Sequence, residues 1–144
     1  KIKKIYSINA GFFCTNDYIE KYGRPETLED LSTHSLVGFM DEEYDIPKNL
    51  ILLNVKNNEE IAINLPFRIF TNNEINNIKL ILTDEMIAGL FYIHTNDLQT
   101  LTTKELINVL PEYQYVTKYY LMKHPYNNQF NINLFCQFVE ECLG

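Results

Sequence analysis

The 144-residue chain has three histidines and three cysteines, which commonly bind metals or act as bases and nucleophiles: His34, His94, His124, Cys14, Cys136 and Cys142. Each histidine stands without a neighbouring Cys, Asp or His at ligand spacing, and the sequence has no C-x-x-C pair. Cys136 and Cys142 are six residues apart, which places them on different faces of a helix. These spacings favour free thiols and structural histidines, and they predict neither a metal site nor any other cofactor.

Two features keep an enzymatic function open. Cys14 with a histidine would be a nucleophile and base, but Cys14 follows two phenylalanines in a predicted buried strand, where burial raises a thiol pKa. The acidic cluster Asp41-Glu42-Glu43, with Asp45 close by, would suit a hard cation, although its spacing lacks the calcium-loop pattern and favours a solvated loop. The sequence has no G-x-S-x-G elbow, H-E-x-x-H motif or glycine-rich phosphate loop. The chain is therefore predicted not to be an enzyme.

Charge and hydropathy argue against two further classes of protein, those that bind nucleic acid and those that span a membrane. Nineteen acidic residues against 12 basic ones give a formal net charge of −7. Phosphate binding depends on clustered Lys and Arg, so such a chain makes a poor nucleic-acid surface. Alternating tyrosines at 113–120 would stack on bases, but their spacing favours the two faces of a strand. No stretch approaches the roughly 20 apolar residues of a membrane span, and residues 1–5 have no signal-peptide core.

The elements that must position any site follow from periodicity and turn signals. Alternating or continuous apolar runs predict strands, and the polar residues 56–59 predict a hairpin turn. The predicted strands cover residues 5–14, 35–39, 51–55, 60–65, 67–70, 90–93 and 115–122. A short turn at 102–106 leads into the apolar residues 107–111.

Helices are predicted between the strands. Thr15 to Asp17 supply an N-cap for a helix that ends at Gly23, and Thr27 with Asp30 resembles a capping box for residues 28–31. Apolar residues repeat at three and four between 73 and 90, which predicts a helix broken near Thr83-Asp84 by a second N-cap. Residues 133–143 form an amphipathic terminal helix. This alternation of strands and helices predicts an α/β fold.

Five passages resemble the LysR-type transcriptional regulators. Residues 14–25 are similar to the family's (S)P-x-Y-L-x-x-x-G-x-P, and residues 26–37 to its T/P-x-D-L-x-x-H-x-x-I/V. Further matches are residues 70–73 with 86–93 (N-D … A-x-A-G-x-G-I-A), 106–111 (G-x-L-x-x-V-L-P), and 120–125 with 135–139 (L-x-x-x-Y-P … R-A-F-x-D-F-L). The resemblance rests on their order and spacing over residues 12–143. Thr15 replaces the usual proline, Phe91 stands where a second glycine is common, and His94-Thr95 replaces a Leu-Pro-like pair.

The resemblance implies a periplasmic-binding-protein-like (type 2) effector-binding domain. This chain would hold mainly its second lobe, with a mixed sheet flanked by helices, plus a C-terminal amphipathic helix. Residues 1–13 are expected to end the first lobe and form a hinge strand, 14–122 to build the second lobe, and 123–144 to return to the first lobe. The first residue is Lys and not Met. We therefore expect a fragment that lacks the winged helix-turn-helix and most of the first lobe.

The function implied is ligand sensing for a bacterial, cytoplasmic regulator of transcription. A small effector, such as an anion or carboxylate, would bind in the interlobe cleft and control DNA binding by the full-length protein. DNA would be contacted only through the absent N-terminal domain, and the full-length protein would form a homodimer or homotetramer. The fragment itself is expected to self-associate through an exposed apolar face. The alternative is a solute-binding protein of the same fold that serves transport, which needs an export signal and a complete first lobe.

Under this resemblance, eight residues are expected to face the cleft: Thr15, Asn16, Phe39, Met40, Thr71, Asn72, Asn73 and His124. Two stretches, beginning at Thr15 and at Thr71, open helices. Phe39 and Met40 end a buried strand, and His124 lies just past the second hinge strand. Each also has a structural explanation, as a plain N-cap for Thr15, Asn16 and Asn72 or as core for Phe39. The residues leave open whether they bind an effector or only cap and pack.

Overall fold

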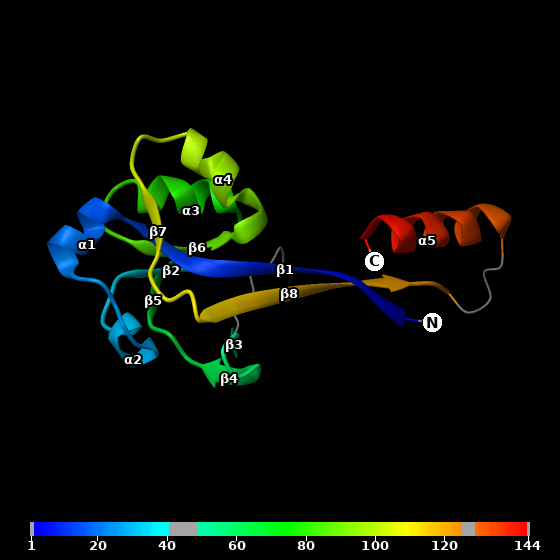
Figure 1. Ribbon diagram of the computed structural model, residues 1–144, viewed down its shortest axis with the longest axis horizontal. Coiled ribbons are helices and arrows are strands. Elements are labelled where there is room, and N and C mark those ends of the chain that lie inside the picture. Colours follow the sequence, from blue (N-terminus) through cyan, green and yellow to red (C-terminus); the bar gives the residue numbers. More distant parts are fainter. Residues whose placement is uncertain (1, 41–48, 125–128, 144) are drawn as a thin grey trace. The chain divides into compact units, whose positions relative to one another are not determined.

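The computed structural model describes residues 2–40, 49–124 and 129–143 (Figure 1). The acidic cluster within residues 41–45 lies outside the described residues. The chain divides into two compact units. The main unit is Asn9–Val116, and the terminal unit comprises Lys1–Ile8 with Thr117–Gly144. The two compact units need not coincide with the lobes of the family fold, so the lobe limits at residues 13 and 122 stay predictions.

A mixed sheet is the centre of the fold. Its strand order is β4-β3-β8-β1-β6-β2-β5, and β7 also pairs with β1. The strands are β1 (Ile2–Thr15), β2 (Leu36–Phe39), β3 (Leu50–Asn54), β4 (Glu59–Ile63), β5 (Phe67–Thr71), β6 (Ile87–Phe91), β7 (Leu106–Asn108) and β8 (Tyr113–Met122). β2 runs parallel to both β5 and β6, whereas β1 is antiparallel to β6 and β7. β3 pairs antiparallel with β4, which confirms the predicted hairpin.

The helices are α1 (Asn16–Tyr22), α2 (Leu28–Leu31), α3 (Glu74–Ile81), α4 (Tyr92–Thr100) and α5 (Phe130–Leu143). The capping chemistry predicted for the first two is confirmed. Thr15 accepts a hydrogen bond from the Tyr18 amide, and Thr27 and Asp30 form a reciprocal capping box. Gly23 follows α1 with φ of 84°, a conformation that favours glycine.

Two predictions around residue 85 are wrong. The helix that begins after Asn73 ends at Ile81, and no second helix starts at Asp84, which instead adopts φ of 63° in a turn. The following strand is β6 (Ile87–Phe91), and the chain is already helical at Tyr92. The repeat at three and four extended to residue 87 because β6 is buried on both faces and is therefore continuously apolar. Helix α4 has no side-chain cap and one buried residue, Leu98, so it left little periodic signal.

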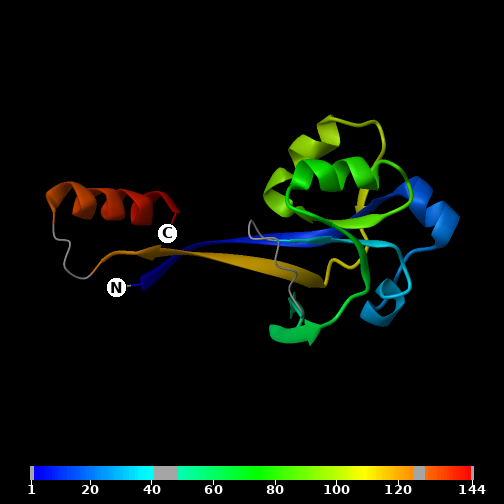
Figure 2. The ribbon, with the colours of Figure 1, turned by 180° about the vertical axis from the view of Figure 1, so that it is seen from behind.

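Alternate residues of β1 supply two hydrophobic clusters. Phe12 and Cys14 pack with Tyr18, Leu31 and other residues on one side of the sheet. Phe13 packs on the other side, in a cluster that contains residues of α3, β6 and α4. In the main unit, α3 and α4 cover one face of the sheet and α2 lies on the opposite face (Figures 1 and 2). Both faces of the central strand are thus buried, as its apolar sequence requires.

Asn77 joins three elements of the main unit. Its side chain is fully buried; Oδ1 accepts a hydrogen bond from the Thr71 hydroxyl at the end of β5, and Nδ2 donates to the Gly89 carbonyl of β6 at 2.9 Å. A Cβ on Gly89 would lie 2.8 Å from a ring carbon of Phe39, so β2 and β6 approach closely here. The amide of Asn77 thereby fixes where α3 sits against the ends of two strands.

We expect Asn77→Ala to lower the free energy of unfolding by about 2–3 kcal/mol, because the partners of the lost amide stay buried and unpaired. Urea denaturation measures this change. The control is Asn76→Ala, an exposed residue on the same helix, for which a change within about 0.5 kcal/mol is expected. Equal effects of the two substitutions would contradict the role of Asn77.

Candidate functional site

The carboxyl ends of three strands meet at one edge of the main unit's sheet. β2 runs parallel to both β5 and β6, and Phe39 pairs in register with Thr71. The Met40 amide donates to the Thr71 carbonyl at 2.9 Å, which extends this pairing by one residue. We call the ends of β2, β5 and β6 with the residues that follow them the carboxyl edge. In open α/β sheets, ligands bind outside the carboxyl ends of the strands.

Polar residues open α3 at the carboxyl edge. Thr71 is buried, and its hydroxyl is engaged by Asn77 and by the Asn73 carbonyl at 3.2 Å. Asn72 and Asn73 are exposed. The Asn73 side chain caps α3 by accepting from the Asn76 amide at 2.8 Å, and it donates to the Asn72 Oδ1 at 3.2 Å. The first amides of α3 and two exposed carboxamides therefore lie together at this edge.

Glu74 supplies a negative charge to the same edge. Its Oε1 accepts from the Phe91 amide at 2.6 Å, and its Oε2 lies 2.6 Å from the His94 Nδ1. The Glu74 side chain is 13% exposed, whereas the His94 side chain is 52% exposed. Phe91 is the N-cap of α4 and its side chain makes no capping hydrogen bond. Glu74 takes over that role from a different helix, which suits the positive end of the α4 dipole.

Aromatic rings border these polar groups. Phe39 and Phe91 are half-buried and stack with ring centroids 5.9 Å apart, and the His94 ring meets Phe91 edge-on at 6.2 Å. Small-molecule sites commonly combine such apolar surface with a few hydrogen-bonding groups. The carboxyl edge has both, drawn from β2, β5, β6 and the helices that follow.

A second polar group, missed in the sequence analysis, lies close to this edge along β1. Asn9 Nδ2 donates to Gln114 Oε1 at 2.6 Å, and Asn108 Nδ2 donates to the Tyr92 hydroxyl at 2.8 Å. Burial is the main cause that raises the pKa of Tyr92 above its usual value. A Cβ on Gly11 would lie 2.7 Å from the Tyr92 oxygen, so only glycine leaves room for that ring. No periodicity signals these contacts, because four different elements contribute one residue each.

The structure brings together five of the eight predicted site residues: Phe39, Met40, Thr71, Asn72 and Asn73. Thr15 and Asn16 lie at the other end of the sheet. Because β1 is antiparallel to β6, Ala10 pairs with Phe91, and Thr15 lies five residues, or about 17 Å, further along the strand. His124 is an exposed residue of the terminal unit.

Comparison with known proteins adds the fold family. No family model matches the sequence, and no curated protein matches it. Among solved structures, the regulatory domain of AphB from Vibrio vulnificus treated with cumene hydroperoxide matches with a TM-score of 0.69 and 18% identity, covering 98% of this chain and 69% of that one. The regulatory domain of CrgA, a LysR-type transcriptional regulator from Neisseria meningitidis, matches with a TM-score of 0.63, 18% identity and coverage of 100% and 69%.

A third match is the full-length Vibrio cholerae virulence activator AphB, a member of the LTTR family, with a TM-score of 0.71 and 16% identity. The alignment covers all of this chain and 48% of that protein. The chain has the fold of a LysR-type regulatory domain. The predicted fold class, a periplasmic-binding-protein-like type 2 domain with a mixed sheet flanked by helices, is thereby confirmed. The chain spans about half of a full-length regulator of this kind.

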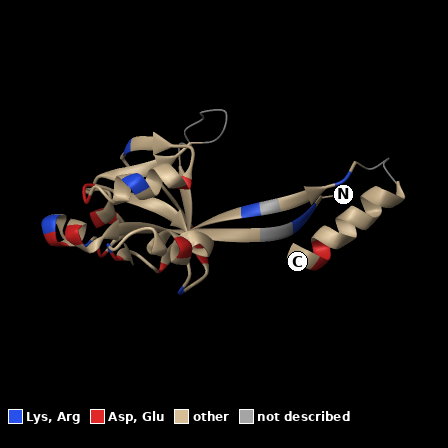
Figure 3. Cartoon of the chain, turned by 90° about the horizontal axis from the view of Figure 1, so that it is seen from above, with Lys and Arg blue, Asp and Glu red and all other residues tan. Residues whose placement is uncertain are grey.

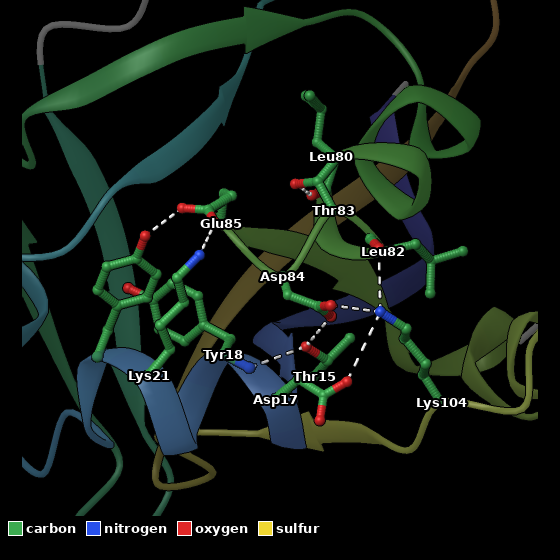
Figure 4. Close-up of polar contacts among 11 residues, drawn as sticks. Thr15, Asp17, Tyr18, Lys21, Leu80, Leu82, Thr83, Asp84, Glu85 and Lys104 are labelled. Carbon is green, nitrogen blue, oxygen red and sulfur yellow. Dashed lines mark hydrogen bonds and ion pairs between the residues drawn. The ribbon is translucent and has the colours of Figure 1, made fainter.

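Within this LysR-type fold, Thr15 is held by its own unit's structure (Figure 4). Its hydroxyl accepts from the Tyr18 amide at 3.1 Å and donates to Asp84 Oδ1 at 2.6 Å. Lys104 Nζ pairs with Asp84 and lies 3.7 Å from Asp17 Oδ2. Hydrogen bonds from Lys104 and Thr15 hold the pKa of Asp84 below its usual value. The Thr15 side chain is fully buried, and both of its hydrogen bonds are made to groups of the fold: the start of α1 and the turn after α3.

Asn16 and the residues considered above for catalysis do not come together as a site in the described part of the chain. Asn16 is exposed and donates to Glu20 one helical turn away at 3.2 Å. Burial raises the pKa of Cys14 to about 12, so its thiolate is scarce at neutral pH. Among the described residues, no three His, Cys, Asp or Glu side chains gather where a metal ion would be held. No helix of that part of the chain is long and apolar enough to cross a membrane.

We expect Thr15→Ala to lower the free energy of unfolding by about 1–2 kcal/mol, because a buried cap and a hydrogen bond to Asp84 are lost together. Thr15→Ser keeps the hydroxyl and should retain most of that free energy. Chemical denaturation of the three proteins measures the difference. If Ser and Ala variants were equally destabilised, the hydroxyl would not be the stabilising group.

Thiol labelling tests the one cysteine with a conceivable catalytic role. Cys14 is buried, Cys136 is half-buried and Cys142 is exposed. We expect a chromogenic disulfide reagent at pH 8 to label Cys136 and Cys142 in the folded protein and Cys14 only after denaturation. The control, Cys14→Ser, should remove the late thiol alone. Rapid labelling of Cys14 in the folded protein would contradict its burial and would support the hypothesis of an enzyme that uses this thiol.

Proposed function

We propose that this chain is the effector-sensing part of a LysR-type transcriptional regulator. The observation that carries the proposal is the fold, which matches regulatory domains of such proteins over 98–100% of this chain. The descriptions of the neighbours name regulatory domains and transcriptional regulators, and not catalytic domains. On this proposal the regulator acts in the cytoplasm and reads DNA through a domain outside these 144 residues.

The lobe assignment belongs to the same proposal. Residues 1–13 and 123–144 would be the chain's share of the first lobe, and residues 14–122 would be the second lobe. Effector binding in the interlobe cleft would change lobe closure and so the geometry between subunits of a homodimer or homotetramer. The effector shifts that equilibrium only by its difference in affinity for the two arrangements.

The carboxyl edge is the proposed wall of the effector site on the second lobe. Asn72 and Asn73 offer exposed carboxamides, Met40 and Phe39 end the neighbouring strand, and Thr71 anchors the turn. His124, which follows β8, remains a proposed contributor from the returning segment. A small effector at this edge would not reach Thr15 or Asn16, about 17 Å further along β1. We therefore assign Thr15 to capping α1 and Asn16 to a contact within that helix.

A carboxylate-bearing effector fits the hydrogen-bond donors at the start of α3. Helix amides and the positive end of the dipole favour a negative group, and the two carboxamides add donors. Glu74 opposes this preference, but its carboxylate already accepts from the Phe91 amide and contacts His94. Removing the charge of Glu74 therefore tests the charge of the molecule that binds beside it.

The alternative of a solute-binding protein shares the fold class. The descriptions of the neighbours favour regulation, because they name regulatory domains and transcriptional regulators. Reading the parent gene upstream of these residues separates the two. A helix-turn-helix there supports the regulator, and an export signal supports transport.

The effector proposal is tested by calorimetric titration of small organic acids into a polypeptide that contains the complete regulatory domain. We expect Asn72→Ala to weaken binding at least about fivefold without changing the unfolding free energy by more than about 0.5 kcal/mol. Asn76→Ala, exposed but beyond the N-cap of the same helix, is the matched control and should bind like the parent. Unchanged binding by Asn72→Ala would remove the carboxyl edge from the site.

Glu74→Gln tests the charge of the effector. Glutamine still accepts from the Phe91 amide but carries no charge. A carboxylate effector should then bind roughly threefold to tenfold more tightly. Weaker binding would indicate a neutral or cationic molecule instead and would overturn the carboxylate assignment.

A further inference from the structure

A hydrogen bond joins helix α1 to the turn between α2 and β2. The Tyr18 hydroxyl lies 2.5 Å from Nδ1 of His34, and the centroids of the two rings are 5.7 Å apart. Tyr18 is 1% exposed and belongs to the hydrophobic cluster that contains Cys14 and Leu31, whereas His34 is half-buried. The pair therefore connects a fully buried helix residue to a titratable residue nearer the surface.

The donor in this hydrogen bond follows from the other partner of Tyr18. Burial raises the pKa of the Tyr18 hydroxyl to about 12, and the backbone of Ser35, which donates a hydrogen bond to the same oxygen, opposes that rise. The hydroxyl therefore keeps its proton throughout the range in which a histidine titrates. Because its oxygen already accepts from the backbone, its proton is directed to His34, and Nδ1 is the acceptor of a neutral ring.

A proton on Nδ1 of His34 would remove this acceptor. Both nitrogens of a charged imidazole ring are donors, so the ring and the Ser35 backbone would both donate to the Tyr18 oxygen, and the hydroxyl proton would need a new acceptor. Within the described part of the chain, His34 is the side chain that hydrogen-bonds to this hydroxyl. A buried hydroxyl without an acceptor costs free energy, so the neutral ring fits the folded state better than the charged ring.

The charges around the pair do not reverse this preference. Burial lowers the pKa of His34, and the negative charge of Asp30 on α2 opposes this only in part. The titratable groups that act on Tyr18 come from three other places: Cys14 of β1, Tyr22 of α1 and Glu85 of the turn after α3. Glu85 is itself paired with Lys21. Acidic and basic residues are interspersed at the end of the main unit where α1 lies (Figure 3). Burial is therefore the larger influence on His34, and it favours the neutral ring.

We propose that the Tyr18–His34 hydrogen bond is a pH-sensitive contact, which holds α1 against the link from α2 to β2 while His34 is neutral and is lost when His34 takes up a proton. The contact precedes the amino end of β2, whereas the carboxyl edge begins at the other end of that strand. The proposal therefore does not rest on effector binding, and either one can fail without the other.

The direction of the pH dependence follows from the linkage between protonation and folding. A histidine whose pKa is lower in the folded state than in the unfolded chain binds its proton more readily after unfolding. His34 therefore does not change the free energy of unfolding well above its unfolded pKa of about 6.5, and it lowers that free energy as the pH falls from about 6.5 toward the pKa of the folded state. Helix α1 should consequently open more often in mild acid than at neutral pH.

Nuclear magnetic resonance titration of the three histidine rings tests the contact, with each ring signal assigned by substituting that histidine with glutamine. We expect His34 to titrate below its ordinary pKa, and Tyr18→Phe should raise the pKa of His34, because the neutral ring loses the donor that stabilises it. The matched control is Tyr22→Phe, which removes from the same helix a hydroxyl that donates to Glu85. It should leave the pKa of His34 unchanged. A pKa of His34 at or above the ordinary value, or equal effects of the two substitutions, would overturn the proposal.

Amide hydrogen exchange at pH 7.5 and 5.5, corrected for the pH dependence of the intrinsic exchange rate, tests the effect on α1. Acidification should reduce the protection of the α1 amides at least about threefold more in the parent than in His34→Gln. Glutamine can still accept from the Tyr18 hydroxyl, but it does not titrate. His94→Gln, which removes the histidine that contacts Glu74, should behave like the parent. If acid reduced the protection of α1 equally in the parent and in His34→Gln, the contact would not be the pH-sensitive element.

Discussion

The burial of β1 on both faces is the constraint on which the main unit depends. Phe12 and Cys14 enter one hydrophobic cluster and Phe13 enters the other, because successive side chains of a strand point to opposite faces. Helices must therefore cover both sides of the sheet, and β6 and β8 must flank β1 to satisfy its backbone. The same burial raises the pKa of Cys14 and removes it from chemistry.

The two ends of this sheet have different roles. At one end, Thr15, Asp84 and Lys104 tie the start of α1 to the turn after α3, and every polar group in that cluster is engaged by another. At the carboxyl edge, Asn77 and Glu74 engage buried or helix-opening groups, while Asn72 and Asn73 remain exposed. Saturated polar contacts stabilise the fold, whereas exposed donors beside aromatic rings suit a ligand.

In the terminal unit, by contrast, large apolar side chains are left exposed. One side of α5 is half-buried, at Ile132, Cys136 and Val139, and the other side is apolar and exposed. The fold neighbours are longer than this chain, which covers 69% of two regulatory domains. An apolar helix face of this size costs free energy in water until it is covered. The stability of the terminal unit is therefore expected to depend on what covers this face, more than the stability of the main unit does.

The sequence by itself determined the elements whose signals are local. Thr27 and Asp30 predicted a capping box, residues 56–59 a hairpin turn, and the spacing of motifs a LysR-like fold, because these depend on neighbours within a few residues or on chain order. Only the tertiary structure decided that Asp84 lies in a turn and begins no helix, that Tyr92 begins one, and that Thr15 lies far from Asn72. The antiparallel pairing of β1 with β6 made that last decision. Strand direction depends on hydrogen bonds between residues some 80 positions apart, and no local pattern encodes it.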